Sequence, residues 1–397
     1  MVRCIHYLSR IRLEDGGVAR AVLDFCRVFA GLGNQVTLLT GDATDVPPEW
    51  QRTGETSTPN QGLNLPRVAL VDEPRGLLEL FPIPAKLRAT ELLRDCDLLH
   101  LHAPWTPSNV QLASIAHRLG VPYVLSAHGM LDDWSMARMH LKKRLFLTLA
   151  ANRMMRRAAR VHCTAQAELD QAAKWLPRNN GVVLPLVMDL SSFETLPGPD
   201  AARQRFPLLR SDGVKLLFLS RVHPKKGVDL LIRAVAELQR QGRKTTLLVA
   251  GPGETRYVNQ LRKLSAELGV GAQIEFPGMV RGVEKLSLYQ AADLFVLPTS
   301  QENFGLVLVE AMACRLPVIT TRGVDIWKEL SEAGASIIEP TPAAIAAGIQ
   351  TLLADPTFPQ RGNRGRAWVL DKLDPQCVAR RYESLYQQIS DETRETR

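Results

Sequence analysis

Apolar runs rich in Val, Ile and Leu alternate with helical patterns along almost the whole chain, and this alternation restricts the possible folds more than any other feature. Such runs are typical of parallel strands that are buried on both faces and connected by helices. The expected strands of the first half are 2–8, 35–40, 67–71, 97–101, 121–126, 160–164 and 181–187. Those of the second half are 214–220, 244–250, 272–276, 293–297, 316–320 and 335–338. The sequence therefore predicts an α/β fold with two doubly wound parallel sheets.

The stretch 191–212, which lies between the two series of strands, is crowded with Pro, Gly and polar residues. This composition is typical of a linker between domains. We therefore expect a first domain over 1–190, a second domain over 213–374, and a C-terminal helix over 375–397 that packs back toward the first domain. In doubly wound sheets, ligands bind beyond the carboxyl ends of the strands. The residues that directly follow each strand are thus the candidates for a functional site.

The bulk composition indicates a protein of the cytoplasm. Of the 397 residues, 45% are hydrophobic, which is enough for sizeable cores. The six cysteines form no Cys-x-x-Cys pair, as expected of buried, reduced thiols. The N-terminus lacks the apolar length of a secretory signal, and no apolar run approaches the roughly 20 residues that span a bilayer. We expect a cytoplasmic protein, either soluble or peripheral on the inner face of the membrane.

The net charge of +8 is concentrated in the segment 138–160, which has eight basic residues and no acidic one. The basic residues are Arg138, Lys142, Lys143, Arg144, Arg153, Arg156, Arg157 and Arg160. Basic residues among large apolar ones suit an anionic membrane surface. A nucleic-acid partner is not expected, because aromatic residues are sparse there and no nucleic-acid motif appears. A core helix with a solvated basic face is the alternative.

Two carboxylates near a predicted helix are the strongest local signal for chemistry. The helix that begins near Gly305 is apolar at nearly every position except Glu310, and Glu302 lies eight residues before Glu310. A buried carboxylate is costly unless it is paired or bound to a ligand. Sugar and ribose hydroxyls are donors that suit such a pair, and the backbone N–H groups of the loop suit ligand oxygens. Alternatively, Glu302 caps the helix and a neighbouring Arg pairs with Glu310.

Three loops that follow predicted strands suit phosphate groups. Arg221 and Lys226 lie directly after strand 214–220 and before a helix N-terminus, which favours a diphosphate site. Gly251 follows strand 244–250 and permits a close approach of the backbone to a ligand. Gly17 lies in a turn after the first strand that lacks both the dinucleotide fingerprint and the P-loop motif. Binding of NAD or ATP there is therefore not expected.

Histidines lie at the ends of two strands of the first domain. His100 and His102 share one face of a strand, but no third ligand has suitable spacing, so no metal is expected. His128 follows the strand 121–126. A purely structural role is the alternative for His100 and His128. The pair Asp132–Asp133 is interpreted as a helix cap rather than a metal site.

Together these motifs resemble glycosyltransferase family 4, the retaining enzymes of the GT-B fold, over nearly the whole chain. The Glu-x7-Glu box formed by Glu302 and Glu310 is the most specific part of the resemblance. The resemblance implies two doubly wound, Rossmann-like domains that face each other across a cleft. The first domain would bind the acceptor and the second the nucleotide-sugar donor. No cofactor is implied.

The same resemblance implies a role for each candidate residue. Arg221 and Lys226 would bind the donor diphosphate and stabilise the leaving phosphate without a metal, Glu302 would contact the transferred sugar, and His128 would lie near the reacting carbon. These four are the expected catalytic residues, and Glu310 would hold the ribose hydroxyls. The remaining expected donor contacts are Gly17, Gly251, Asn303, Phe304, Gly305 and Leu306. His102 is expected on the acceptor side, and the backbone of 278–281 is expected to recognise the base.

The segment 97–105 resembles bacterial members that build surface polysaccharides on lipid carriers. We therefore expect transfer from a UDP- or GDP-sugar to a saccharide or lipid-linked acceptor, with retention, in the biosynthesis of a surface polysaccharide or glycoconjugate. One departure concerns 185–189, which reads Pro-Leu-Val-Met-Asp where the family commonly has Pro-Asn-Gly-Val-Asp. Two alternatives stay open: a nucleotide-sugar epimerase of the same fold and a catalytically silent binding scaffold.

Overall fold

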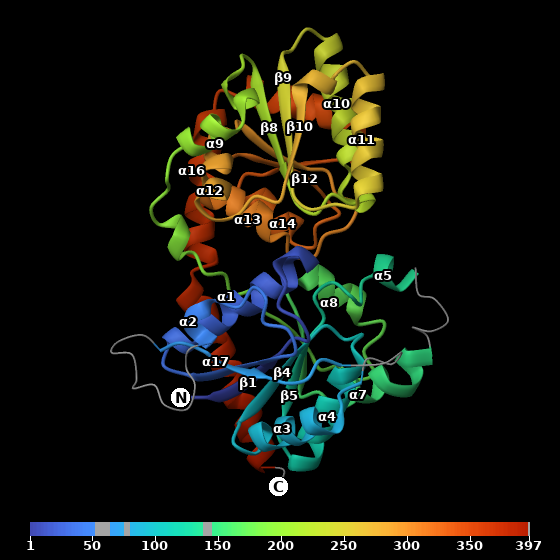
Figure 1. Ribbon diagram of the computed structural model, residues 1–397, viewed down its shortest axis with the longest axis vertical. Coiled ribbons are helices and arrows are strands. Elements are labelled where there is room, and N and C mark those ends of the chain that lie inside the picture. The colour runs from blue at the N-terminus through green and yellow to red at the C-terminus, as the bar shows by residue number, and fades with distance from the viewer. Residues whose placement is uncertain (52–63, 75–79, 138–144, 396–397) are drawn as a thin grey trace. The chain divides into compact units, whose positions relative to one another are not determined.

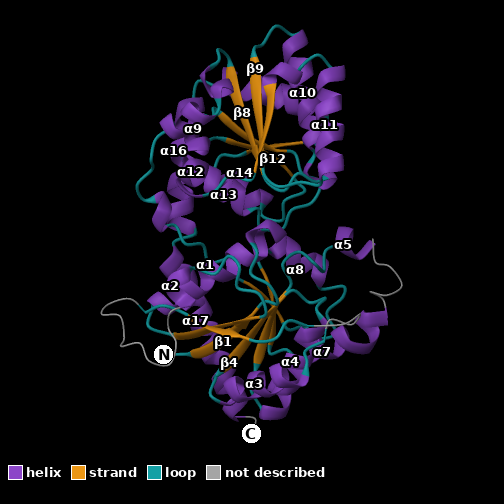
Figure 2. Cartoon of the chain, viewed as in Figure 1, coloured by secondary structure: helices purple, strands orange, loops and turns teal. Residues whose placement is uncertain are grey.

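The computed structural model describes residues 1–51, 64–74, 80–137 and 145–395 of the chain. These residues form two compact units. The first unit contains Met1–Asp189 and Pro375–Arg397, and the second contains Leu190–Asp374. In each unit, helices cover both faces of a parallel sheet (Figures 1 and 2). The prediction of an α/β fold with two doubly wound parallel sheets is confirmed.

The sheet of the first unit has seven strands in the order β3-β2-β1-β4-β5-β6-β7. Its strands are β1 Arg3–Tyr7, β2 Gln35–Thr40, β3 Arg67–Leu70, β4 Leu98–His102, β5 Tyr123–Ser126, β6 Arg160–Cys163 and β7 Gly181–Val183. Its α-helices are α1 Gly17–Gly31, α2 Pro48–Gln51, α3 Ile83–Arg94, α4 Pro107–Leu119, α5 Asp133–Ala137, α7 Asn152–Arg157, α8 Gln166–Ala172 and α17 Pro375–Glu395. All seven expected strands of this half are present, although the last one is shorter than expected.

Alternate residues of each strand enter different cores because successive side chains point to opposite faces of a sheet. Tyr7 and Leu99 belong to the core beneath α3 and α4. Leu38 and Leu98 belong to the core beneath α1 and α17, to which Tyr386 of α17 also contributes. The last helix of the chain, red in Figure 1, is thus an integral part of the first unit.

The sheet of the second unit has six strands in the order β10-β9-β8-β11-β12-β13. Its strands are β8 Val214–Leu219, β9 Thr245–Ala250, β10 Ile274–Gly278, β11 Leu294–Leu297, β12 Val318–Thr321 and β13 Ser336–Ile338. Its α-helices are α9 Asp200–Arg205, α10 Val228–Arg240, α11 Thr255–Glu267, α12 Gly282–Ala291, α13 Leu306–Ala313, α14 Trp327–Glu332, α15 Pro342–Ala354 and α16 Phe358–Lys372. The strand order reverses between β8 and β11, and ligands of doubly wound folds bind beyond the strands at such a point.

The stretch 191–212 is part of the second unit rather than a free linker. It contains α9, whose Ala202 N–H donates to Ser287 Oγ of α12 at 2.9 Å. The N–H of Gly198 donates to the side chain of Gln290 on the same helix. Proline and glycine therefore mark tight turns here, and the chain passes between the units near Asp189 and again near Asp374.

The basic segment 138–160 is described only in part, because 138–144 lie outside the described residues. On α7, Arg153, Arg156 and Arg157 are exposed, whereas Met154 and Met155 are buried in the core. The apolar residues of α7 thus belong to the core, and its basic residues are exposed. Among the described residues we find no helix with the length and apolar character that a bilayer crossing requires.

Candidate active site

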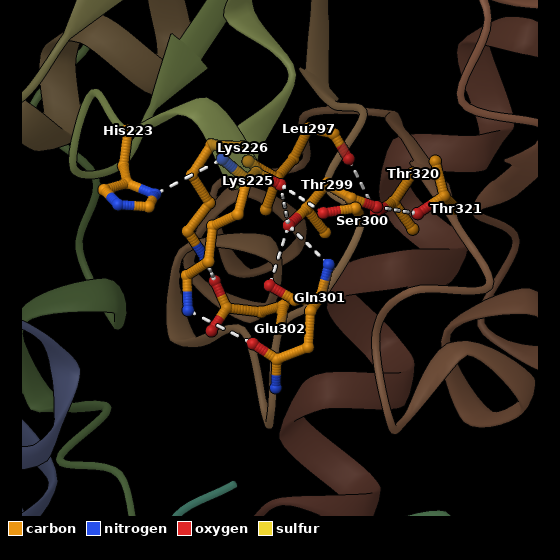
Figure 3. A network of polar contacts seen from close by, with 10 residues as sticks. All are labelled: His223, Lys225, Lys226, Leu297, Thr299, Ser300, Gln301, Glu302, Thr320 and Thr321. Carbon is orange, nitrogen blue, oxygen red and sulfur yellow. Dashed lines mark hydrogen bonds and ion pairs between the residues drawn. The ribbon is translucent and has the colours of Figure 1, made fainter. Parts of the chain in front are cut away.

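The buried Lys226 forms an ion pair with the partly exposed Glu302 beyond the carboxyl ends of β8 and β11 (Figure 3). The Lys226 side chain is only 3% exposed. The two loops are also joined through their backbones, since Ser300 N–H donates to Lys225 O at 2.8 Å. Gly227 lies next to this junction, where a Cβ atom would be 2.3 Å from Pro298 O, so only glycine fits. The reversal of strand order thus brings together two residues that are 76 positions apart.

Electrostatics keep Glu302 ionised. Burial alone would raise the pKa of Glu302, but the positive charges of Lys226, Lys225 and Arg221 outweigh burial and lower the pKa below its ordinary value. Lys225 also donates a hydrogen bond to Gln301 Oε1 at 3.1 Å. The loop therefore combines cationic groups, which suit a diphosphate, with a carboxylate that can only accept hydrogen bonds.

The turn that carries Glu302 and Asn303 is held by the segment after β12. Glu302 N–H donates to Gly323 O at 2.7 Å, and Asn303 Nδ2 donates to the Asp325 carboxylate at 3.0 Å. Gly305 has a φ of +68° and caps α13, the helix that begins at Leu306. The Phe304 side chain is buried in the core, so this residue offers a ligand its backbone. Sequence spacing did not indicate Asp325, because it lies on a loop of another strand.

Glu310 is 4% exposed and has partners on both carboxylate oxygens. Lys285 Nζ donates to Oε1 at 2.7 Å, and Tyr289 Oη donates to Oε2 at 2.8 Å. Burial and the nearby carboxylate raise the pKa of Tyr289 well above its ordinary value, so its hydroxyl stays a donor. The expected alternative partner was an arginine, whereas the actual partners are a lysine and a tyrosine of α12. Each oxygen keeps a second lone pair for a ligand hydroxyl.

Gly251 lies where a Cβ atom would be 1.9 Å from Ser220 O, and its φ is +133°. Close packing of the β8 and β9 loops therefore requires glycine here. A cavity of about 300 Å³ lies beside this turn, against α11, and is lined by residues that include Val222, Gly251, Arg262 and Phe276. None of Arg221, Lys226, Glu302 and Glu310 lines this cavity.

In the first unit, three histidines form a hydrogen-bonded row. His128 Nε2 lies 2.9 Å from His102 Nδ1, and His102 Nε2 lies 3.1 Å from His6 Nδ1. Burial lowers the pKa of His6 and of His128 to about 3 and that of His102 well below its ordinary value, so all three are neutral at pH 7. His102 is buried, and its two ring nitrogens contact His6 and His128. The role on the acceptor side that the sequence predicts for His102 stays a prediction.

A second hydrogen-bond chain runs through His100. Because Leu184 O can only accept, His162 Nε2 is the donor of that 2.8 Å bond, and its Nδ1 accepts from Ser126 Oγ at 2.7 Å. Ser126 then accepts from His100 Nε2, and Tyr386 Oη donates to His100 Nδ1 at 2.6 Å. Each ring nitrogen of His100 thus has a hydrogen-bond partner within the protein, as a structural role would require.

His6 lies close to His100 and His102, and the spacing of residues along the sequence did not reveal it as a third histidine. Ring nitrogens of His6, His100 and His102 lie within 4.8 Å of one another, which is close enough for ligands of one metal ion. Protein hydrogen bonds nevertheless occupy both nitrogens of His100 and of His102. The arrangement is therefore one of hydrogen-bonded neutral imidazoles.

Two acidic residues support the loop that carries His128. Glu168 of α8, which sequence patterns did not single out, accepts from Gly129 N–H at 2.6 Å. Asp132 accepts from Ser135 N–H at the start of α5, as expected of a helix cap. Gly17 is the first residue of α1, so its N–H has no carbonyl partner within the helix.

Comparison with known proteins agrees with this geometry. The family described as Glycosyl transferases group 1 matches residues 200–367, and the Glycosyl transferase 4-like domain matches residues 16–186. D-inositol 3-phosphate glycosyltransferase 1 of Catenulispora acidiphila is 33% identical over 369 residues, which cover 86% of this chain and 84% of the relative. The chain belongs to the family 4 type of glycosyltransferases.

Other relatives of this glycosyltransferase extend the similarity over the same length. D-inositol 3-phosphate glycosyltransferase of Frankia alni is 32% identical over 391 residues, which cover 89% of this chain and 90% of that protein. The crystal structure of Anabaena Alr3699/HepE in complex with UDP and glucose has a TM-score of 0.76 at 18% identity and covers 98% of this chain and 100% of that one. This likeness shows that the fold is GT-B.

Proposed function

We propose that the enzyme transfers a sugar from a UDP- or GDP-sugar to a saccharide or lipid-linked acceptor, with retention of configuration and without a metal. The ion pair of buried Lys226 with Glu302, with Arg221 close enough to act on that carboxylate, is the observation that carries this proposal. A dense positive charge at the strand ends can stabilise the charge that grows on the leaving diphosphate. We propose surface polysaccharide or glycoconjugate biosynthesis as its setting.

Each residue of the proposed site has a role that follows from its charge. Arg221 and Lys226 bind the diphosphate, with Lys226 sharing its protons between the phosphate and Glu302. Ionised Glu302 accepts hydrogen bonds from sugar hydroxyls, and Glu310 accepts from the ribose hydroxyls. His128, which is neutral, contacts the sugar near the reacting carbon without adding charge. The backbone of 278–281 recognises the base, and Gly17, Gly251 and residues 303–306 supply further donor contacts.

The acceptor is proposed from two sources. The segment 97–105 supports a lipid-linked saccharide, as in bacterial members that build surface polysaccharides. The relatives named D-inositol 3-phosphate glycosyltransferase support a phosphorylated polyol instead. A lipid-linked acceptor would place the enzyme at a membrane, where the exposed arginines of α7 could bind anionic headgroups.

Release of nucleoside diphosphate from a panel of UDP- and GDP-sugars, with and without each acceptor class and in the presence of EDTA, tests the proposal. We expect release that depends on acceptor, survives EDTA and falls sharply in Arg221→Ala. Proton NMR of the product then reports the anomeric configuration. Conversion of the donor to an epimer without acceptor would favour the epimerase, and nucleotide binding without turnover would favour the scaffold. Loss of activity in EDTA with rescue by manganese would contradict the metal-free mechanism.

A further inference from the structure

The turn after β5 has a backbone conformation that side chains disfavour. His128 has a φ of +50° and Gly129 a φ of +70°, so two consecutive residues are left-handed. Glycine adopts this conformation freely, whereas it is uncommon for residues with a side chain, histidine included. Residues held in this way gather at active sites, and the surroundings that hold them are then part of the site.

Glu168 provides the surroundings on the backbone side. Its carboxylate is fully buried and accepts from Gly129 N–H at 2.6 Å through Oε1, and from Thr164 N–H at 2.6 Å and Thr164 Oγ at 2.9 Å through Oε2. Among the described residues, no ion pair includes Glu168. A buried carboxylate without a cation is costly, and the bonds to Thr164 alone would only cap α8. Through its bond to Gly129, Glu168 also holds the turn that contains His128.

The ring of His128 is fixed independently, by its 2.9 Å hydrogen bond to His102. Backbone and ring are therefore held by two different elements, α8 and β4. We propose that Glu168 is a positioning residue for His128: it anchors Gly129 N–H and so keeps His128 in the left-handed turn that presents its ring to the sugar. The inference rests on the proposed function in that His128 contacts the transferred sugar.

Glu168→Gln and Thr164→Val form a matched pair of variants. Glu168→Gln keeps the shape of the side chain but turns an N–H group toward the backbone N–H of Gly129 or of Thr164. Thr164→Val removes the hydroxyl hydrogen bond to the same carboxylate and leaves the bond to Gly129 in place. With UDP-glucose and GDP-mannose as donors, we expect kcat of Glu168→Gln to fall about 10- to 100-fold. Its Kd for UDP and GDP and the kcat of Thr164→Val should stay near those of the wild type.

A double-mutant cycle with His128→Ala separates positioning from loss of stability. If Glu168 acts through His128, Glu168→Gln should not lower kcat further in the His128→Ala background. An equal loss of kcat in both backgrounds would overturn the inference, as would an unchanged kcat in the single variant. A wild type that releases no nucleoside diphosphate would contradict the proposed function instead.

Amide hydrogen exchange of the full-length wild type tests the same anchor without any donor. We expect the Gly129 N–H to be protected as strongly as the strands, although it lies in a turn, and Glu168→Gln to lose that protection by more than the change in global stability explains. Rapid exchange of Gly129 in the wild type would overturn the inference, even if the variant failed to fold.

Discussion

The two candidate regions of the enzyme differ in charge. The second unit places the ion-paired Lys226 and Glu302 beyond its strands, and Glu302 stays ionised. The first unit places five histidines near its strand ends, and burial lowers the pKa of each so that all are neutral at pH 7; they are His6, His100, His102, His128 and His162. Charged groups suit the diphosphate, and neutral hydrogen-bonding groups suit an uncharged sugar or a glycan hydroxyl. The difference fits our proposal that the second unit binds the donor diphosphate, whereas the first unit presents neutral groups to the sugar.

Removal of the central cation should have the largest effect. In Lys226→Ala, the diphosphate loses a partner and the partly exposed Glu302 loses its ion pair. We expect kcat to fall about 10²- to 10³-fold and the free energy of unfolding to fall by about 1–3 kcal/mol. Steady-state kinetics and urea unfolding measure the two effects.

Lys225→Ala is the matched control, because the neighbouring Lys225 bonds to the neutral Gln301. Its loss of stability should be under about 1 kcal/mol. A double change of Lys226→Ala with Glu302→Gln should recover most of the stability but none of the activity. Full activity of Lys226→Ala would show that the ion pair only stabilises the fold.

Glu310→Gln should weaken nucleotide binding and leave the fold intact. The loss of a charge-assisted hydrogen bond to ribose should cost about 1.5–3 kcal/mol of binding free energy. Calorimetric titration with UDP and GDP measures it. Tyr289→Phe keeps the carboxylate and removes one of its partners, so its loss of nucleotide affinity should be smaller. Unaltered affinity in Glu310→Gln would identify Glu310 as a structural residue.

Acid should destabilise the first unit through its neutral histidines. His6 has a pKa of about 3 in the folded protein, against an ordinary value near 6.5, so the unfolded chain binds more protons between these values. The stability from neutral His6 is fully present above pH 6.5 and is lost as the pH falls toward 3. At pH 5 the loss relative to pH 7 should be about 2 kcal/mol for this residue.

Thermal unfolding of the wild type and of His6→Phe between pH 7 and pH 5 tests this. The variant should show a shallower fall of stability with decreasing pH, because it removes one of the groups that protonate on unfolding. Parallel curves for the two proteins would mean that the pKa of His6 is the same in the folded and the unfolded protein.

The smallest effect concerns the exposed face of α7. Each arginine near an anionic surface contributes about 1 kcal/mol, and salt screens this attraction. We expect the wild type to sediment with phosphatidylglycerol vesicles at low salt, and the combined change Arg153→Glu, Arg156→Glu and Arg157→Glu to reduce it while donor hydrolysis persists. Equal sedimentation of both proteins would make the basic residues of α7 an ordinary solvated face.

Much of the fold could be predicted because buried parallel strands are apolar over their whole length. The strands around Leu99, Val124 and Leu217 could be located from composition alone, and with them the loops that carry the candidate residues. Which strands lie next to each other in the sheet was harder to predict from the sequence. His6 lies beside His100 because β1 neighbours β4, and nothing in the spacing of two histidines reveals a third one 94 residues earlier.

The residues that hold the predicted site residues in place were the hardest to predict from the sequence. Lys285 and Tyr289 reach Glu310 from another helix, and Glu168 reaches Gly129 from α8, the helix that follows a neighbouring strand. Such contacts depend on how helices pack against a sheet, which periodicity does not determine. The stretch 191–212 illustrates the converse: its prolines and glycines suggested a linker, although its short helix packs on α12.

The position of α17 has a consequence for the order in which the enzyme folds during synthesis. Tyr382 and Tyr386 donate hydrogen bonds to Pro185 O and to buried His100, so the first unit is complete only once these residues have left the ribosome. The second unit ends at Asp374, so it does not need the last helix to be complete. Although domains usually fold in the order of their synthesis, the half of this glycosyltransferase that is translated first must therefore be the last to reach its native state.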